Sequence, residues 1–290
     1  MKQAFERESG LLYLVATPIG NLGDMSHRAV EVLKKVDLIA CEDTRRSRSL
    51  LDEYGIDRPL VPLHEHNEDK AAPGLLSRLQ AGESIALISD AGTPLINDPG
   101  FPLVRLVREA GIRVTPIPGA CALIAALCAS GLPTHRFAFE GFPPRKTSAR
   151  IAFFETLRHD PHTLVFYESS HRIEETLHDL ARVFPSSRRL VVARELTKFY
   201  ETLVSSTVGE ACSLLEADPE MRLGEFVLMV EGDRPASPEE GLTPQQQQVL
   251  SMLLEECSVK TAATLTAKIT GARREQAYRL ALEIKSEGKG

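Results

Sequence analysis

One polar stretch of the chain combines residues whose main chain could bind a small ligand. The stretch from Ser89 to Gly100 holds two glycines, two prolines and two aspartates within twelve residues. Glycine and proline restrict the path of the backbone and leave its amides free to contact a ligand. A plain connector between a strand and a helix is the alternative, but connectors of that kind need only about 2 to 6 residues. Length and composition together therefore favour a binding site.

Four further groups of charged side chains each follow an apolar run. They are Glu42 to Arg46, His64 to Glu68, Glu168 to Arg172 and Arg194 to Glu201. Each group mixes carboxylates with cations or histidines, which are the side chains that move protons or stabilise developing charge. The group from His64 to Glu68 could be read as a metal site. We interpret it as a hydrogen-bonding cluster and predict no metal, because zinc needs three or four ligands and no cysteine or third histidine lies nearby.

Apolar runs in the first half predict the strands that position these groups. They cover residues 11–16, 36–41, 60–63, 85–88 and 113–117, and the segments between them have helical spacing. We expect Asp24 or Ser26 to cap the first helix. Such alternation is typical of βαβ units with a parallel sheet, in which the carboxyl ends of the strands share one edge. The charged groups should therefore meet at that edge.

The second half is expected to repeat this arrangement. Apolar runs predict strands at residues 137–140, 163–167, 190–193 and 226–230, and residues 120–130 predict a tightly packed helix. Residues 234–244 are rich in Pro, Glu and Ser, as linkers are. We predict a flexible segment at 1–10, an α/β domain at 11–119, a second at 120–233, a linker at 234–244 and a helical domain at 245–290.

The last segment predicts three short helices with a turn at Thr270 and Gly271, which resemble a helix-turn-helix. It is locally basic through Lys260, Lys268, Arg273, Arg274 and Arg279. Contact with nucleic acid and packing on a partner subunit both remain open from this pattern.

The composition indicates the cellular compartment of the protein but says little about whether it binds nucleic acid. The formal net charge of −6 argues only weakly against nucleic-acid binding, because a local basic face can hold RNA. The five cysteines are odd in number, widely spaced and without a CxxC pair, which predicts reduced, mostly buried thiols in a cytoplasm. Residues 1–10 lack the apolar core of a signal peptide, and no apolar stretch approaches the length of a membrane span.

Five motifs taken together resemble the tetrapyrrole-methylase-like family, and most closely its branch that modifies ribosomal RNA. The motifs are Val15 to Asp24, Cys41 to Arg45, Ser89 to Gly100, Phe166 to Arg172 and Ala193 to Lys198. The resemblance covers about residues 11–285. It implies two α/β domains with S-adenosylmethionine bound between them, and a homodimer. It also implies methylation of the ribose 2′-hydroxyl of a cytidine in small-subunit (16S) ribosomal RNA.

The resemblance also implies roles for single residues. Those expected to bind the donor are Pro18, Asp90, Gly92, Thr93, Pro94, Leu95, Ile96, Gly119, Cys121, Ala122, Tyr167, Ala193 and Glu225. Ser170 and Ala120 stand where this branch often has proline, which puts only the local loop geometry in doubt. From their charge, and not from the resemblance, the cations that we expect to contact RNA phosphates are Arg45, Arg46, Arg145, Lys146, Arg172, Arg273 and Arg274.

Ribose methylation needs a base or a cation beside the hydroxyl, because the hydroxyl is a poor nucleophile at neutral pH. We expect Glu168 or Glu195 to accept or orient the hydroxyl while Lys198 lowers its pKa, and His171 is a further candidate base. The alternative is that Glu195 only pairs with Arg194 in the wall of the cleft. Two other functions stay open, a methyltransferase acting on a small tetrapyrrole and a ribosome-binding factor without enzymatic activity.

Overall fold

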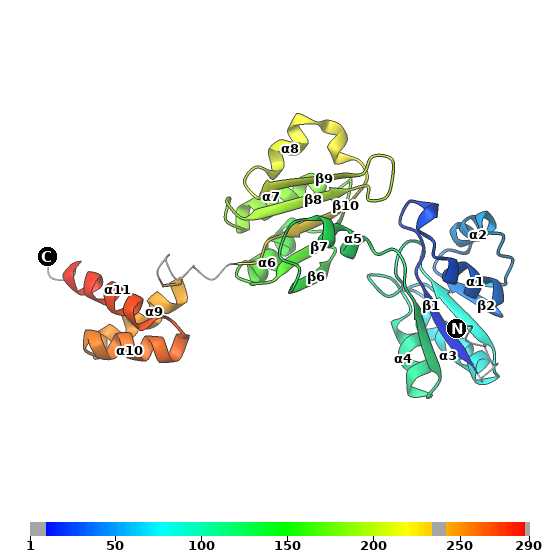
Figure 1. Ribbon diagram of the computed structural model, residues 1–290, viewed down its shortest axis with the longest axis horizontal. Coiled ribbons are helices and arrows are strands. Elements are labelled where there is room, and N and C mark those ends of the chain that lie inside the picture. Colours follow the sequence, from blue (N-terminus) through cyan, green and yellow to red (C-terminus); the bar gives the residue numbers. More distant parts are fainter. Residues whose placement is uncertain (1–9, 234–241, 288–290) are drawn as a thin grey trace. The chain divides into compact units, whose positions relative to one another are not determined.

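The computed structural model describes residues 10–233 and 242–287. Within them the chain forms two compact units (Figure 1). The first runs to Arg158 and from His162 to Glu231, and the second joins residues 159–161 to the C-terminal part. The finer domain limits stay a prediction. Most of the predicted N-terminal segment, and residues 234–241 of the predicted linker, lie outside the described residues.

The first unit contains a five-stranded parallel sheet with the order β3-β2-β4-β1-β5. Its strands are β1 Leu11–Val15, β2 Leu38–Cys41, β3 Leu60–Pro62, β4 Ser84–Ile88 and β5 Arg113–Ile117. All four residues of β2 are buried, as are the last four of β4, which is typical of strands covered on both faces. The parallel pairing of all neighbouring strands confirms the predicted parallel sheet.

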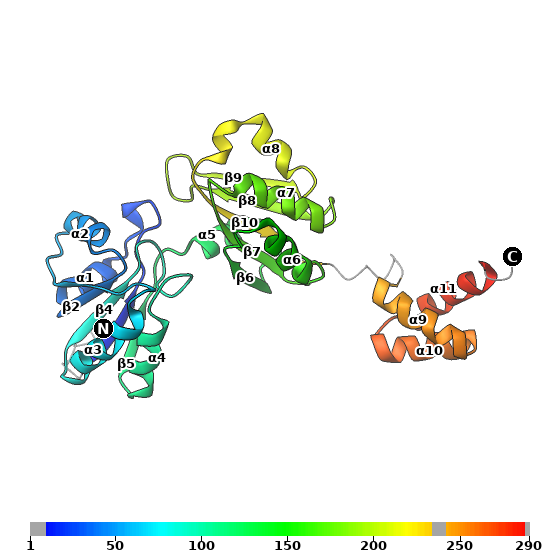
Figure 2. The ribbon, with the colours of Figure 1, turned by 180° about the vertical axis from the view of Figure 1, so that it is seen from behind.

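Helices cover both faces of this sheet (Figures 1 and 2). They are α1 His27–Lys35, α2 Thr44–Glu53, α3 Glu68–Gln80 and α4 Phe101–Glu109, with a short 3-10 helix η1 at Leu22–Asp24. Helices α1 and α2 pack on one face, and α3 and α4 on the other. Ser26 caps α1 by accepting a hydrogen bond from the N–H of Ala29, so of the two expected caps Ser26 is correct.

The second sheet differs from the expectation that it would repeat the first. Its strands are β6 Phe137–Gly141, β7 Thr163–Ser169, β8 Arg189–Arg194, β9 Thr202–Thr207 and β10 Glu225–Val230, in the order β6-β7-β10-β8-β9. Only β6 and β7 are parallel neighbours, whereas β10 is antiparallel to β7 and β8, and β9 to β8. The seven residues between β8 and β9 are too few for a crossover helix, so the chain reverses there.

This mixed arrangement still brings three strand ends to one edge. Strands β7 and β8 both run against β10, so they end where β10 begins, with Glu225 paired to Ser169 and Phe226 to Arg194. The charged groups that come after β7 and β8 therefore meet the start of β10.

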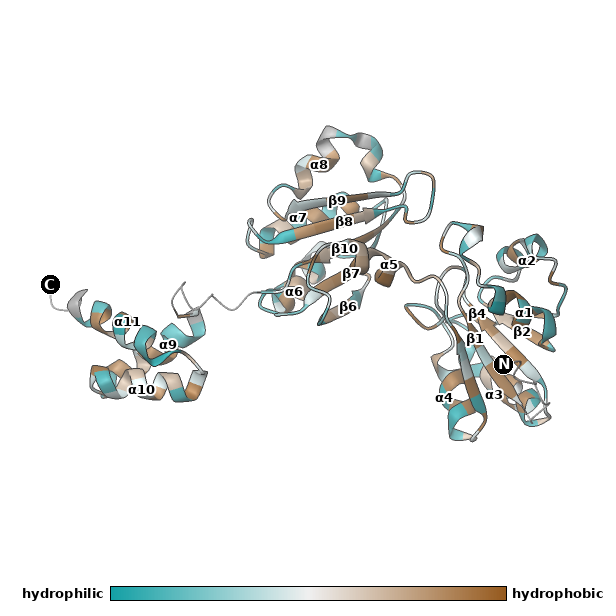
Figure 3. Cartoon of the chain, in the orientation of Figure 1, coloured by the Kyte–Doolittle hydropathy of each residue, from teal (hydrophilic) through white to brown (hydrophobic). Residues whose placement is uncertain are grey.

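Helices also cover both faces of the second sheet. They are α5 Ala122–Ala129, α6 Thr147–Leu157, α7 Ile173–Val183 and α8 Ala211–Ala217, followed by a 3-10 helix η2 at Pro219–Arg222. Helices α6, α7 and α8 share one hydrophobic core with the sheet, and α5 packs on the opposite face. Figure 3 shows hydrophobic residues concentrated along the strands of both sheets.

The C-terminal unit consists of α9 Pro244–Glu256, α10 Val259–Thr270 and α11 Arg274–Glu287. It has its own small core, in which Leu250, Ala262, Ala263, Ala277 and Ala281 are fully buried. Thr243 and Gln246 form a capping box at the start of α9, and Gly271 ends α10 in the left-handed conformation. The three predicted helices are confirmed.

Two further findings concern membrane-spanning helices and the cysteines. Of the helices in the described residues, none is long and apolar enough to cross a membrane. All five cysteines are free thiols, but only Cys41 is buried and Cys128 is exposed, so the expectation of mostly buried thiols is wrong. Apolar neighbours in sequence did not predict burial because Cys128 lies on the exposed side of α5.

Candidate functional site

The loop after β4 folds back onto the end of β1. The N–H of Thr17 donates to the carbonyl of Gly92 (2.8 Å), and the N–H of Gly92 donates to the carbonyl of Thr17 (3.1 Å). The Ser89 hydroxyl adds a third bond to the Gly92 carbonyl (3.1 Å). Gly92 has a φ of +87°, and a Cβ there would lie 3.2 Å from Ile19. Glycine is therefore needed for this close approach.

Backbone strain within the described residues is concentrated in two loops. The non-glycine residues with positive φ are Leu95 (70°), Asn97 (66°), Glu195 (50°) and Thr197 (67°). The first two lie in the loop after β4 and the other two in the loop after β8. Such conformations cost about 1 to 3 kcal/mol each and persist only where the surrounding structure imposes them, commonly at functional sites.

A cavity of about 340 Å³ lies where the β4 loop meets the end of β7 and the start of β10. Its volume is within the usual range for small-molecule sites. Among the predicted donor-binding residues, those that line it are Asp90, Gly92, Thr93, Ile96, Cys121, Ala122, Tyr167 and Glu225. The cavity does not include Pro18, Pro94, Leu95, Gly119 or Ala193. For the lining residues as for these, donor binding stays a prediction.

The sequence did not single out several residues that line this cavity. They are Ile19, Asn97, Asp98, Phe142 and Leu196. Ile19 lies inside the motif from Val15 to Asp24, Asn97 and Asp98 lie inside the predicted loop, and Leu196 lies inside a predicted charged group, so position in the chain was a usable signal for these four. Phe142 carried no such signal, because its place depends on how the segment after β6 folds.

Tyr167 forms one wall of the cavity. Its ring contacts Phe139 and Phe142 edge-on, with centroid distances of 4.8 and 5.7 Å. Its hydroxyl accepts a hydrogen bond from the N–H of Leu123 (3.1 Å), one of the free donors in the first turn of α5. Burial, and then the neighbouring Cys121, raise the pKa of Tyr167 to about 12. The side chain therefore stays a neutral phenol.

Carboxylates border the cavity, and two of them, Asp98 and Glu42, have raised pKa values. Burial, and then the nearby Glu42, raise the pKa of Asp98 to about 7. Burial, and then Asp90, raise the pKa of Glu42. Asp90 itself accepts hydrogen bonds from the N–H of Asp43 (3.1 Å) and from Arg46 (3.3 Å). A ligand with a positive charge would relieve the repulsion among these acids. Within the described residues, no three His, Cys, Asp or Glu side chains are grouped to hold a metal ion.

An ion-pair cluster lies beside the cavity at the edge formed by β8 and β10. The Lys198 ammonium donates to Glu195 Oε1 (2.8 Å) and Glu225 Oε2 (2.9 Å), and the N–H of Glu225 donates to Glu195 Oε1 (2.9 Å). Burial opposes ionisation of both groups, but these bonds outweigh it, so the pKa of Glu195 is lowered and that of Lys198 is raised. Both groups are therefore charged at neutral pH.

Two glycines make room for this cluster. A Cβ on Gly224, whose φ is +107°, would lie 2.5 Å from Cγ of Glu195. A Cβ on Gly20, in the loop after β1, would lie 2.4 Å from Cγ of Lys198. The stem of Lys198 thus packs directly on the first loop of the chain.

The four expected catalytic side chains have different surroundings. Glu168 is fully buried and accepts hydrogen bonds from Thr176 (2.7 Å) and the N–H of Ser169 (2.8 Å), besides an ion pair with Arg172. Glu195 pairs with Lys198, not with Arg194, whose Nε donates to the Leu223 carbonyl. His171 is exposed. Which of the four is catalytic stays a prediction.

The expected RNA-contacting cations are exposed, with one exception. Arg45 and Arg46 have side chains 92% and 75% exposed, and Arg145, Lys146, Arg273 and Arg274 are exposed as well. The side chain of Arg172 is only 18% exposed and donates to the carbonyls of Pro143 and Pro144.

Comparisons with known proteins agree with this geometry. Residues 11–212 match the model of the Tetrapyrrole (Corrin/Porphyrin) Methylases, and residues 240–285 match the RsmI C-terminal HTH domain. A solved structure of uroporphyrin-III C-methyltransferase from Thermus thermophilus, complexed with S-adenyl homocysteine, shares the fold with a TM-score of 0.51 and 20% identity, over 76% of this chain and 97% of that one.

Two curated relatives are similar along almost their whole length. The ribosomal RNA small subunit methyltransferase I of Xylella fastidiosa strain Temecula1 is 52% identical over 269 residues, which cover 93% of this chain and 98% of that one. The protein of the same name from Escherichia coli O157:H7 is 50% identical over 281 residues, which cover 97% of this chain and 98% of that one. The chain therefore belongs to the tetrapyrrole (corrin/porphyrin) methylases and, within them, to the family of ribosomal RNA small subunit methyltransferase I.

Proposed function

We propose that the chain uses S-adenosylmethionine to methylate the ribose 2′-hydroxyl of a cytidine in 16S ribosomal RNA. The observation that carries the proposal is that the chain matches, over nearly its whole length and at 50–52% sequence identity, relatives named for methylation of small-subunit ribosomal RNA. The match includes the C-terminal helical unit, which a methyltransferase acting on a small tetrapyrrole would not need.

The cavity suits this donor in charge and in the apolar character of part of its lining. The side chains of Ile19, Ile96 and Leu196 give it apolar surface for an adenosine. Asp98 and the neighbouring carboxylates complement a sulfonium or an ammonium group. The T. thermophilus protein of the same fold holds the corresponding demethylated product, which supports the same use of the cavity here.

The ion-pair cluster is the part of the site that we assign to the acceptor. When bound, the donor supplies an electrophilic methyl group, and the hydroxyl must approach it in line at about 3 Å. Both bonds to Glu195 go to Oε1, so we assign Oε2 to the hydroxyl proton. The lowered pKa makes Glu195 a weak base, and its stronger effect is to hold Lys198 in place. The Lys198 ammonium then stabilises the negative charge that develops on the oxygen.

Surface residues beside this cluster support a single-stranded RNA acceptor. Phe199 and Tyr200 are 93% and 60% exposed, and they follow Lys198 directly. Their rings contact each other edge-on at 5.0 Å, and unstacked bases bind such aromatic surfaces. Arg45, Arg46 and Lys146 offer contacts for phosphates.

The proposal includes a homodimer that acts in the cytoplasm on ribosomal RNA or on the assembled small subunit. The C-terminal unit exposes Met252, Ile269 and Leu282, with 55%, 64% and 48% exposure, which supports packing against another surface. Five free thiols are compatible with a reducing compartment.

The test is a methylation assay on small ribosomal subunits from cells that lack the enzyme. Purified protein and donor should add one methyl group to one cytidine ribose, located by mass mapping of the 16S RNA. Donor binding by calorimetry is measured in parallel. Methylation of a porphyrinoid but not of RNA would indicate the tetrapyrrole activity. RNA binding without donor binding would indicate a ribosome-binding factor.

A further inference from the structure

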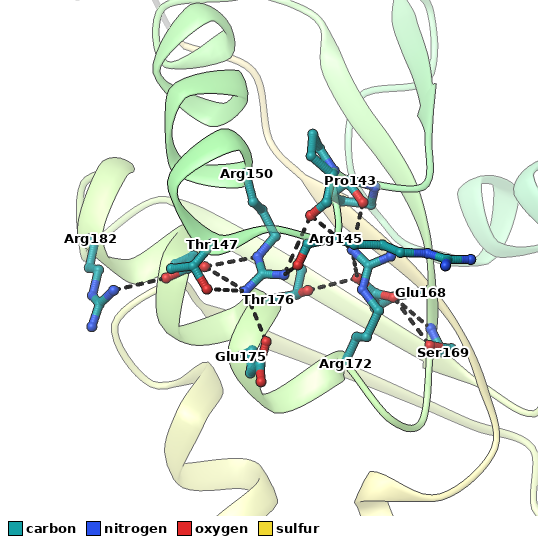
Figure 4. A network of polar contacts seen from close by, with 12 residues as sticks. Pro143, Arg145, Thr147, Arg150, Glu168, Ser169, Arg172, Glu175, Thr176 and Arg182 are labelled. Carbon is teal, nitrogen blue, oxygen red and sulfur yellow. Dashed lines mark hydrogen bonds and ion pairs between the residues drawn. The ribbon is translucent and has the colours of Figure 1, made fainter.

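Arg150 is a fully buried cation on α6 that contacts the segment before its own helix. Its guanidinium bonds the Asp179 carboxylate through Nε (2.8 Å) and Nη2 (2.7 Å) and pairs with Glu175 (3.2 Å). The remaining nitrogen, Nη1, donates to the carbonyls of Arg145 (3.2 Å) and Pro144 (3.5 Å). In Figure 4 the Arg150 guanidinium lies between Glu175 on one side and the Arg145 carbonyl on the other.

Arg172 approaches the same segment from the start of α7. Its Nη2 donates to the carbonyls of Pro143 and Pro144 (3.2 Å for the second) and lies 3.3 Å from Glu168 Oε2. Glu168 is held in turn by Thr176. Two guanidinium groups therefore bind three consecutive carbonyls, those of Pro143, Pro144 and Arg145 (Figure 4).

The segment held in this way links two parts of the proposed site. Phe142, at one end, lines the cavity and contacts the Tyr167 ring. Arg145 and Lys146, at the other end, are exposed cations. The segment itself contains two prolines, so it has no helix or sheet hydrogen bonds of its own at those positions.

A role in stability alone explains these arginines poorly. A buried ion pair contributes little net stability compared with apolar side chains of the same volume, because desolvation offsets the attraction. A planar guanidinium can satisfy a carboxylate and two carbonyls in one fixed geometry, which lysine cannot reproduce. The arrangement is suited to fixing the direction of a backbone segment.

We propose that Arg150 and Arg172 are positioning residues, which we call the guanidinium clamp. The clamp sets the path of residues 142–146, so that Phe142 closes the donor cavity while Arg145 and Lys146 face the RNA. The inference rests on the proposed function, and it adds that donor binding depends on Arg172 through Phe142.

The test is a double-mutant cycle on donor binding, with Arg172→Lys and Phe142→Ala separately and combined. Arg172→Lys keeps the positive charge but loses the planar guanidinium that binds two carbonyls at once. We expect donor binding to weaken about fivefold, which corresponds to about 1 kcal/mol. In the Phe142→Ala background the same substitution should change affinity less than about twofold, because its effect passes through the missing ring. Arg182→Lys is the matched control, since Arg182 pairs with Asp179 at 3.1 Å and contacts none of the three carbonyls.

Nuclear Overhauser effects between the rings of Phe142 and Tyr167, whose centroids lie 5.7 Å apart, are measured on the same variants, with Arg150→Lys as a second clamp variant. The effects should weaken in Arg172→Lys and Arg150→Lys but not in Arg182→Lys. Equal effects of Arg172→Lys on affinity in both backgrounds, or an unchanged ring contact in both clamp variants, would overturn the clamp. If the unsubstituted protein bound no donor, the proposed function would fail, while the ring contact would still decide on the clamp.

Discussion

Asp98 shows how a single carboxyl group can oppose folding and still serve binding. The pocket holds its pKa near 7, against an ordinary value of 3.8, because burial and Glu42 disfavour the charged form. A raised carboxyl pKa means that the folded state binds the proton more tightly than the unfolded chain does. The stability from this group is therefore present at low pH and is lost as the pH rises towards 7.

Asp98→Asn should therefore stabilise the donor-free protein, and increasingly so as the pH rises from 4 to 7. At pH 8 we expect the melting temperature to rise by about 2 to 4 °C, the shift that roughly 1 kcal/mol produces in a chain of this size. Donor binding should weaken, because the complementary charge is gone. Thermal melts with and without donor at pH 5 and pH 8 check both effects. An equal shift at both pH values would contradict the assigned cause.

Lys198 gives a prediction about rate. Lys198→Ala should lower kcat about 10²- to 10³-fold, as loss of one group that stabilises transition-state charge does. Donor binding should fall much less than kcat, since Lys198 itself does not line the cavity and only its partner Glu225 does. Single-turnover rates and calorimetry measure the two quantities. Equal loss of both would remove Lys198 from the chemistry and make it a donor-binding residue.

The loops after β1, β4 and β8 are in close contact. Backbone hydrogen bonds between Thr17 and Gly92 join the first two, and the aliphatic stem of Lys198 joins the third to the first. Gly20 belongs to the first of these loops and lies under the Lys198 stem. The position of the Lys198 ammonium therefore depends on the contact between the loops after β1 and β8, and not on Lys198 alone.

Gly20→Ala should reproduce most of the kinetic loss of Lys198→Ala without removing any charge. The added Cβ would lie 2.4 Å from Cγ of Lys198 and must displace it. Gly82→Ala is the matched control, because Gly82 also has a positive φ (+93°) but open space around it. Both variants carry backbone strain, so only a difference in kcat between them reports on Lys198. Similar kcat values would show that the contact is unimportant.

The sequence predicted those parts of the site that are formed by continuous segments of the chain. Ser89 to Gly100 was recognisable because it is a long loop after a strand of a parallel sheet, and the group after β8 because its charged residues follow an apolar run; both loops border the cavity or its ion-pair cluster. The direction of the strands in the second sheet was not predictable, since the apolar run of β10 is equally compatible with parallel and antiparallel neighbours. Strand β9 was missed because Thr202–Thr207 is mostly threonine and serine, as an edge strand can be.

Burial of polar groups was the least predictable property. Arg150 lies in a helix with alternating small and apolar neighbours, which gives no local sign that its side chain is fully buried. Its partners Asp179 and Glu175 come from another helix, α7, so only tertiary packing reveals the pairing. The same holds for Glu168, a predicted base that the fold surrounds with donors.

At the scale of the whole molecule, the C-terminal unit should add affinity for RNA without changing donor binding. Arg273→Ala with Arg274→Ala should weaken RNA binding and reduce the slope of log affinity against log salt by about 1 per lost phosphate contact. Lys34→Ala, which removes an exposed charge at the end of α1, is the control. An unchanged slope would favour the other role considered for this unit, packing on a partner subunit.

The central position of β10 has a consequence for synthesis of the chain. The first sheet is complete once β5 ends at Ile117, whereas β7 and β8 gain their shared partner only when residues 225–230 have emerged. Until then, two strands with fully buried apolar residues have open edges, the kind of surface that chaperones bind. We expect the first sheet to form early during translation and the second to form late, in one step, when its last strand inserts between strands already made.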